Sequence, residues 1–281
     1  MNDRPRGAPD LVALYVPGNR PALFEKALVG PDVVILDLED AVPLAAKDDA
    51  RRAVRSWVDG LDQASRARIS VRVNAVGTPQ HSQDLAAVAD LGGLHSVRVP
   101  KVESREDVAA VSAVVGDLPV HALLETARGI EAAATVAASP GVGALAIGEA
   151  DLRSDLGVTA EDGLAWARSR VVVAARAAGL PAPMMSAWTD LEDDQGLLAS
   201  CRAGRGMGFL GRTAVHPRQV PTIRAGFAPS EEEVAHARAL LRHLGDDHDE
   251  RGIAVTESGH MVDRAMVRNA EQVLALHDAS R

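Results

Sequence analysis

Eight short apolar runs recur along the chain, and segments with helical spacing separate them. Each run is continuously apolar, which is typical of parallel strands buried on both faces. The runs are 11–16, 33–39, 68–74, 96–101, 120–125, 143–148, 183–188 and 212–217. Eight successive βα units predict an α/β fold, a (β/α)8 TIM barrel, in preference to an open doubly wound sheet with extra edge strands.

The segments between the runs carry helical periodicity and start signals. The clearest predicted helices cover 20–30, 45–58, 104–116 and 160–179. Ser104 and Thr159 are each followed by two acidic residues, so both are predicted to be helix N-caps.

The pattern changes after Phe227. Residues 229–244 predict one more amphipathic helix, capped by Ser230 with Glu233 three residues on. A charged turn follows, and then a short hairpin and a final helix. This tail does not fit a ninth βα unit. We therefore expect a catalytic barrel over residues 1–228 and a C-terminal extension over 229–281 that packs over a barrel mouth, its own or a neighbour's.

The bulk properties exclude several classes of protein. A net charge of −9 argues against binding to nucleic acid or to an anionic membrane. Cys201 is the single cysteine and is predicted to be a buried small residue. The polar N-terminus lacks the apolar core of a signal peptide, and Arg176 interrupts the longest apolar run. These features predict a cytoplasmic protein without a membrane or nucleic-acid partner.

Two carboxylates stand where apolar runs stop. Glu125 ends the run in LLETARG, and Asp151 follows the run in AIGEADL. Because one helix lies between them, they would emerge from adjacent strands at the carboxyl end of the barrel and point at the same space. Two hard oxygen ligands with room for water and substrate predict a Mg²⁺ site rather than a closed structural cage.

Other polar residues follow the strands at the same end. They are Asn19, Arg20, Asp37, Glu39, Asp40, Arg72, Asn74, Lys101 and His216. A buried charge needs a partner to offset its desolvation, so a converging set of both signs is hard to explain by packing alone. Such a set could hold a metal and a carboxylate substrate together.

Each of these residues could act on the substrate or could support the structure of the site. Arg72 has the planar fork that suits a bidentate clamp on a substrate carboxylate, but it could equally form an ion pair with Asp37 or Glu39. These two acids could also orient Arg72 and metal-bound water. Lys101 could neutralise a carboxylate or pair with Glu39. His216 is expected to fix its loop, with a role as a base as the alternative.

The ordered motifs resemble one family. They are YVPGNRP, ILDLEDAV followed by Lys47, VRVN, PK, LLETARG, GEADL, VHPRQV and GHMVD. Together they resemble the HpcH/HpaI aldolase–citrate lyase β-subunit family, in its CitE-like branch. The resemblance implies a TIM barrel assembled as a homotrimer or hexamer. It also implies Mg²⁺-dependent cleavage or formation of a carbon–carbon bond next to a carboxylate, often on a coenzyme A thioester.

The resemblance also implies roles for particular residues. Glu125 and Asp151 match the metal ligands, and Arg72 matches the residue that binds the keto-acid or hydroxy-acid carboxylate. Asp263, in GHMVD, matches an acidic residue that neighbouring subunits contribute to the site. Asn19, Arg20 and Lys101 are further candidates for substrate binding. One departure is that the common form Gly-Ala-Glu-Asp-Leu is replaced here by Gly-Glu-Ala-Asp-Leu at 148–152, which leaves Glu149 without an assigned role.

The function expected from this resemblance is a Mg²⁺-dependent carbon–carbon lyase. Its substrate would be a 3-hydroxy-carboxyl acyl-CoA thioester such as malyl-, citramalyl- or citryl-CoA. The catalytic candidates are Arg72, with Asp263 or a water held by Asp37 or Glu39 as the base. Alternatives are a class II pyruvate aldolase acting on free keto-acids, a malate-synthase- or thioesterase-like activity, and a non-enzymatic binding subunit.

Overall fold

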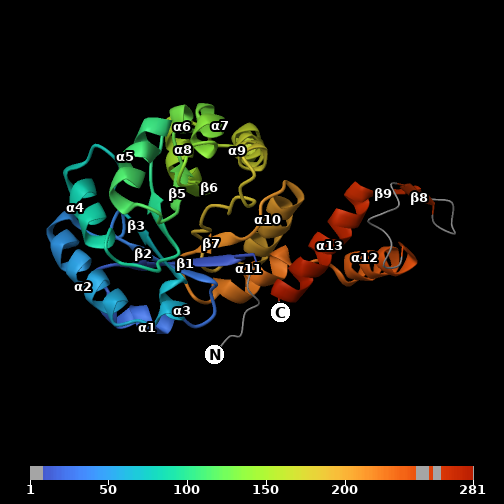
Figure 1. Cartoon of the computed structure of the whole chain (residues 1–281), viewed down its shortest axis with the longest axis horizontal. Coiled ribbons are helices and arrows are strands. Elements are labelled where there is room, and N and C mark those ends of the chain that lie inside the picture. Colours follow the sequence, from blue (N-terminus) through green and yellow to red (C-terminus); the bar gives the residue numbers. More distant parts are fainter. Residues whose placement is uncertain (1–8, 245–252, 256–260, 281) are drawn as a thin grey trace. The chain divides into compact units, whose positions relative to one another are not determined.

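The chain divides into two compact units in a computed structural model that describes residues 9–244, 253–255 and 261–280. One unit covers Asp10–Gly226, and the other is formed mainly by Phe227–Arg281 (Figure 1). The first unit contains the parallel sheet, and the second contains the predicted extension.

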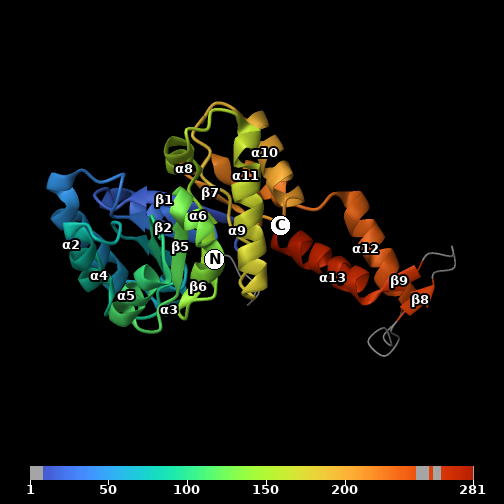
Figure 2. The same cartoon turned by 90° about the horizontal axis from the view of Figure 1, so that it is seen from above.

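Within the described residues, seven parallel strands form one curled sheet in the order β6-β5-β4-β3-β2-β1-β7, with helices on its outer side (Figures 1 and 2). The strands are β1 Val12–Pro17, β2 Val33–Asp37, β3 Ile69–Arg72, β4 Ser96–Val99, β5 Val120–Leu124, β6 Val142–Ile147 and β7 Arg212–Ala214. Each overlaps a predicted run, and the fold is α/β and TIM-barrel-like, as expected from continuous apolar runs.

The predicted strand over 183–188 does not form as a full strand. Met184 makes a single parallel bridge to Ala146 of β6, and Met185 makes one to Arg212 of β7. Pro181 and Pro183 lack the N–H donors that a ladder requires, which limits pairing on this segment. The prediction of eight complete strands is therefore wrong at this position, where a short bridging segment lies between the two edge strands.

Helices connect the strands on the outer side of the sheet. They are η1 Pro21–Leu23, α1 Phe24–Ala27, η2 Leu44–Ala46, α2 Lys47–Asp59, α3 Gln63–Arg66, α4 Pro79–Val88, α5 Arg105–Val115, α6 Ala127–Glu131, α7 Ala133–Ala137, α8 Glu149–Leu156, η3 Glu161–Leu164, α9 Ala165–Ala177, α10 Asp194–Gly206 and α11 Gln219–Phe227. The predicted Ser104 cap is confirmed, because Ser104 and Asp107 form a reciprocal capping box. The predicted Thr159 cap is wrong, since Ala160 precedes the 3-10 turn η3 instead.

The core has two layers. Large aliphatic residues such as Leu14, Leu36 and Leu124 are fully buried. On the other face of the sheet, Ala13 of β1 and Val33 and Ile35 of β2 pack with the partly buried Tyr15 and Met184. Cys201 is buried, as predicted. Scarce aromatic residues are consistent with a layered interior built from aliphatic side chains.

The extension contains two helices and a small hairpin. These are α12 Glu231–Leu244, β8 Ile253–Val255, β9 Met261–Asp263 and α13 Arg264–Ala279, with β8 antiparallel to β9. The predicted Ser230 cap is confirmed, because Glu233 N donates to Ser230 Oγ at 3.1 Å and Ser230 N donates to Glu233 Oε2 at 2.7 Å. The charged turn and the first two residues of GHMVD lie outside the described residues. A lid role over a neighbouring subunit stays a prediction.

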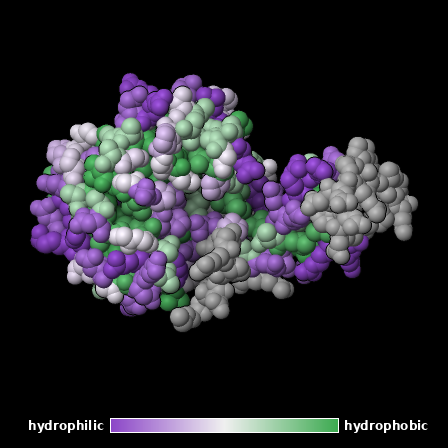
Figure 3. Space-filling view, in the orientation of Figure 1, coloured by the Kyte–Doolittle hydropathy of each residue, from purple (hydrophilic) through white to green (hydrophobic). Residues whose placement is uncertain are grey.

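The surface is mostly hydrophilic over the outer helices α2 and α4, with apolar residues visible further inward (Figure 3). No helix among the described residues combines the length and the apolar character that a membrane crossing requires.

Gly211 should be essential where the bridging segment meets β7. Its φ is +83°, and a Cβ there would lie 2.6 Å from the Leu11 carbonyl oxygen. We expect Gly211→Ala to lower the free energy of unfolding by about 3 kcal/mol or more. An alanine would be strained at this positive φ, and its Cβ would also force the neighbouring backbone to move. Gly179→Ala is the matched control: its φ is +73° with nothing within 4 Å, so it should cost only about 1 kcal/mol. Urea denaturation measures both, and equal losses would contradict the crowding at Gly211.

Candidate metal and substrate site

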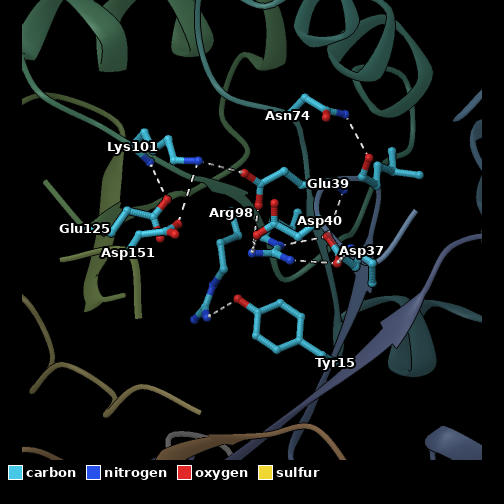
Figure 4. A network of polar contacts seen from close by, with 12 residues as sticks. Tyr15, Asp37, Glu39, Asp40, Asn74, Arg98, Lys101, Glu125 and Asp151 are labelled. Carbon is cyan, nitrogen blue, oxygen red and sulfur yellow. Dashed lines mark hydrogen bonds and ion pairs between the residues drawn. The ribbon is translucent and has the colours of Figure 1, made fainter. Parts of the chain in front are cut away.

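Charged side chains from several strands meet at the carboxyl end of the sheet (Figure 4). Asp37 ends β2, Arg72 ends β3, and Glu125 follows β5 directly. Because parallel strands all end at the same edge, the sheet brings these side chains together although they are far apart in the sequence.

Glu125 is held in a buried position beside the start of α8. The residue is only 4% exposed, and its Oε1 accepts a hydrogen bond from Lys101 N at 3.0 Å. A Cβ at Gly148 would overlap the Glu125 carboxylate, so glycine leaves the room that the carboxylate occupies. Burial, and then the like charges of Glu39 and Asp151, raise the pKa of Glu125 to about 8.

Asp151 lies in the first turn of α8 rather than at the strand end itself. Its side chain is 45% exposed, and its Oδ2 lies 3.7 Å from Lys101 Nζ. A carboxylate is favourable in the first turn of a helix because the helix dipole is positive there. Glu125 and Asp151 therefore face the same lysine, one through its backbone and one through its ammonium group (Figure 4).

Lys101 sits in a strained backbone conformation at the centre of this group. Its φ of +52° is the one positive value at a non-glycine residue among the described part of the chain. Its ammonium lies 3.8 Å from Glu39 Oε1 as well as near Asp151. Burial alone would lower the pKa of Lys101, but the carboxylates, Glu39 foremost, outweigh it and raise the pKa. The lysine is therefore a persistent cation and not a neutral nucleophile.

Arg72 forms a bidentate ion pair with Asp37. Arg72 Nε and Nη2 each donate to one oxygen of Asp37 at 2.7 Å, and Nη1 lies 2.8 Å from Glu39 Oε2. Asp37 also accepts from the backbone N of Glu39 at 2.9 Å and of Ala41 at 3.1 Å. The ion-pair alternative is thus present in the structure, and Asp37 orients Arg72. A clamp on a substrate carboxylate stays a prediction.

Glu39 is less completely hydrogen-bonded than Asp37. Burial raises the pKa of Glu39 to about 7, against the opposing charge of Arg72. Its Oε2 has no hydrogen-bond partner of good geometry, so its 2.8 Å approach to Arg72 is a charge contact rather than a well-formed hydrogen bond. Glu39 can therefore exchange a proton near neutral pH.

A network that the sequence did not reveal supports the loop after β2. Lys47 Nζ donates to the carbonyl oxygens of Leu38 and Glu39, both at 2.7 Å, and to Asn74 Oδ1 at 2.8 Å. Asp84 accepts from Asn74 N at 2.7 Å and from Arg51 Nε at 2.6 Å. These contacts join α2, β3 and α4. Lys47 had a sequence signal through its place in the family-like motif, and Asn74 through its position after a predicted strand, whereas Asp84 had none.

Two further residues missed by the sequence reasoning lie beside Arg72. The Arg72 guanidinium carbon lies 4.7 Å from the centroid of the Tyr15 ring. The Tyr15 hydroxyl accepts from Arg98 Nη1 at 3.3 Å (Figure 4). The available signal was a polar residue in the middle of each apolar run.

Other predicted site residues are not joined to this group by any described contact. Arg20 is exposed, and the Asn19 side-chain oxygen is buried without a hydrogen-bond partner. Their role in substrate binding stays a prediction. His216 is exposed and accepts from Arg218 N at 3.2 Å, which matches a loop-fixing role. Glu149 is turned away, because both its oxygens accept from Arg168 at 2.7 Å.

Asp263 has a local partner that the sequence did not suggest. Its Oδ1 accepts from Met266 N at 2.9 Å, so it is the N-cap of α13. A contribution to a neighbouring subunit's site stays a prediction.

The donor set fits magnesium better than a closed metal cage. Among the described residues, no three His, Cys, Asp or Glu side chains converge as a metal-binding group. Glu125 and Asp151 offer hard carboxylate oxygens, and Mg²⁺ commonly takes one or two carboxylates with water and substrate completing its shell. A structural zinc site would need four protein ligands.

The raised pKa of Glu125 should give stability a pH dependence of defined sign. The folded state holds this proton up to about pH 8, whereas the unfolded chain releases it near 4.5. The unfolding free energy therefore falls as pH rises between these values. Glutamine mimics the protonated acid, so in EDTA Glu125→Gln should melt above the parent at about pH 8.5 and level with it at about pH 5. A difference independent of pH in thermal melts would contradict this reading, and Glu106→Gln on the exposed face of α5 is the control.

Comparisons with known proteins place this site in a family. A family model described as HpcH/HpaI aldolase/citrate lyase matches residues 11–217, which contain every strand of the curled sheet. A (3S)-malyl-CoA thioesterase from Cereibacter sphaeroides is 36% identical over 271 residues, covering 95% of this chain and 94% of that protein. An L-malyl-CoA/beta-methylmalyl-CoA lyase from the same organism is 32% identical over 309 residues, covering 98% and 96%.

A solved structure agrees with these sequence matches. It is CitE from Mycobacterium tuberculosis in complex with magnesium, acetoacetate and coenzyme A. It shares 35% identity and a TM-score of 0.81, covering 98% of this chain and 100% of that one. The resemblance seen in the ordered motifs is confirmed, and the chain belongs to the HpcH/HpaI aldolase/citrate lyase family.

Proposed function

We propose that this chain is a Mg²⁺-dependent enzyme that cleaves or forms a carbon–carbon bond in a 3-hydroxy-carboxyl acyl-CoA thioester, such as malyl-, citramalyl- or citryl-CoA. The observation that carries the proposal is the pairing of Glu125 and Asp151 around Lys101, next to an Arg72 that Asp37 holds in place. We further infer that the bridging segment at Met184 and Met185 acts as the eighth strand of a (β/α)8 barrel.

The roles of the residues follow from their contacts. Glu125 and Asp151 would hold Mg²⁺, which supplies Lewis-acid polarisation of the substrate oxygen when bound. Arg72 and Lys101 bring positive charge to the same place, so an anionic substrate carboxylate is attracted there. The Asp37 fork restricts Arg72, which favours a fixed geometry over a mobile one.

A base must remove the hydroxyl proton when the bond is cleaved. Asp37 is poorly suited, because its oxygens already accept four hydrogen bonds. Glu39 is better suited, since its Oε2 lacks a hydrogen-bond partner and its pKa of about 7 lies near the working pH. Asp263 of a neighbouring subunit is the other candidate for this role.

A thioesterase is the second candidate function, because a malyl-CoA thioesterase is among the similar proteins. A hydrolase would release free coenzyme A and the intact hydroxy acid, whereas a lyase would release a keto-acid and a shorter acyl-CoA. A class II aldolase would instead act on free keto-acids, and a binding subunit would turn over none of them.

The direct test is incubation with a panel of hydroxyacyl-CoA thioesters and Mg²⁺, with products read by mass spectrometry. We expect a keto-acid and a short-chain acyl-CoA. Asp151→Asn should weaken Mg²⁺ binding by at least about tenfold and lower turnover, because one charged ligand oxygen is lost. Glu149→Gln is the control from the same helix turn, since Glu149 pairs with Arg168 and not with the site. Free coenzyme A as the product would favour the thioesterase, and no product would contradict both.

We expect the Asp263 carboxylate to complete the site of a neighbouring subunit in a homotrimer or hexamer. A mixture of Glu125→Gln and Asp263→Asn chains should then regain activity after subunit exchange, because some sites contain both acids. Asparagine still caps a helix, so α13 should keep its N-cap. Full exchange without recovery would show that each site is built from one chain.

A further inference from the structure

Arg98 lies on the concave face of the curled sheet. Its Nη1 lies 3.3 Å from the Tyr15 hydroxyl and 3.5 Å from Thr213 Oγ1. Tyr15 belongs to β1 and Thr213 to β7, and neither strand is adjacent to β4 in the sheet. A contact between such distant strands must cross the concave face. Arg98 therefore points into the interior of the sheet and not toward the outer helices (Figure 4).

Arg98 is buried without an acidic partner. The residue is 4% exposed, its Nε has no hydrogen-bond partner, and no ion pair joins it to a carboxylate among the described residues. The buried arginines Arg51 and Arg168 and the partly buried Arg72 each pair with an aspartate or glutamate. An uncompensated buried guanidinium is costly, because desolvation is offset only by an opposite charge and by completed hydrogen bonds.

Arg212 shows what a buried arginine without an acid looks like when it is structural. Its Nε lacks a hydrogen-bond partner, as in Arg98, but its terminal nitrogens donate to Ser186 O at 3.0 Å and to Ser200 Oγ at 2.7 Å. Arg98 has only two contacts to neutral hydroxyl oxygens, both longer than these. Its guanidinium therefore has spare donor capacity that a carboxylate would match in geometry and charge.

The residues beside Arg98 on this face of the sheet are not all fully buried. Arg98 stands in one register row with Arg72, His121 and Ala144 across β3 to β6. Tyr15, Arg72, His121 and Ala144 keep partial solvent exposure although they share this interior face. The Tyr15 ring is 4.7 Å from the Arg72 guanidinium carbon and 5.9 Å from that of Arg98. Both cations therefore lie close to the Tyr15 ring.

We propose that Arg98, with the hydroxyls of Tyr15 and Thr213, binds a second carboxylate of the acyl substrate and makes the enzyme selective for a hydroxy-acid half that carries two carboxylates. This inference rests on the proposed function, in which the first carboxylate lies at the metal and Arg72. Arg98 is then a specificity-determining residue, and its charge is compensated by substrate and not by the protein.

The experiment compares three keto-acids on the Mg²⁺-loaded full-length chain by calorimetry. Oxaloacetate carries the second carboxylate, 2-oxobutyrate replaces it by a methyl group, and pyruvate lacks it altogether. The parent should bind oxaloacetate about ten- to a hundredfold more tightly than 2-oxobutyrate, which is the expected effect of hydrogen bonds to a charged group. Arg98→Met should abolish this preference and leave the binding of pyruvate within about threefold of the parent. Arg105→Met, on the exposed face of α5, is the control.

Each outcome decides a different point. If the parent binds the three keto-acids equally with Mg²⁺, the inference fails while the proposed function stands. If the parent prefers oxaloacetate and Arg98→Met keeps that preference, another residue binds the second carboxylate and the inference also fails. If none binds in a Mg²⁺-dependent way, the proposed function fails. Should Arg98→Met not fold, Arg98→Gln and Thr213→Val remove parts of the same group, and an unchanged preference in both would again overturn the inference.

Discussion

The ion pair between Arg72 and Asp37 is the contact around which the carboxyl end of the sheet is organised. It joins the ends of β2 and β3, where the two residues are also register partners, and it is completed by backbone donors from the loop after β2. Because Asp37 is fully engaged, Arg72 is fixed in place, and Glu39 is drawn to its remaining edge. Arg72 thus sets the position of Glu39, whereas Glu125 and Asp151 are placed by their contacts with Lys101.

The charges at this end are balanced against burial. Glu125 and Glu39 are buried and have raised pKa values, and Lys101 is held as a cation between Glu39 and Asp151. A divalent cation stabilises buried carboxylates that lie near other negative charges, because the ion relieves their mutual repulsion. The same features that would destabilise an unliganded fold therefore favour a metal and an anionic substrate.

Charged side chains are also present on the interior face of the sheet. Arg72 and Arg98 both lie near the Tyr15 ring, and within the described part of the chain Arg72 pairs with acids whereas Arg98 pairs with none. These polar side chains stand beside the aliphatic layer formed by Ala13, Val33 and Ile35.

The fold class, the order of the strands and the placement of Glu125, Asp37 and Arg72 at strand ends could be predicted from local patterns, because buried parallel strands leave a continuous apolar signal. The sequence pattern did not reveal that the strand at Met184 is reduced to isolated β-bridges, because that outcome depends on which backbone groups pair next to the prolines. The tertiary arrangement commits Arg72 to Asp37, makes Asp263 the N-cap of α13, and leaves Arg98 without an acidic partner among the residues that the structure describes. These outcomes depend on distances between side chains that are remote in sequence, and local patterns do not encode them.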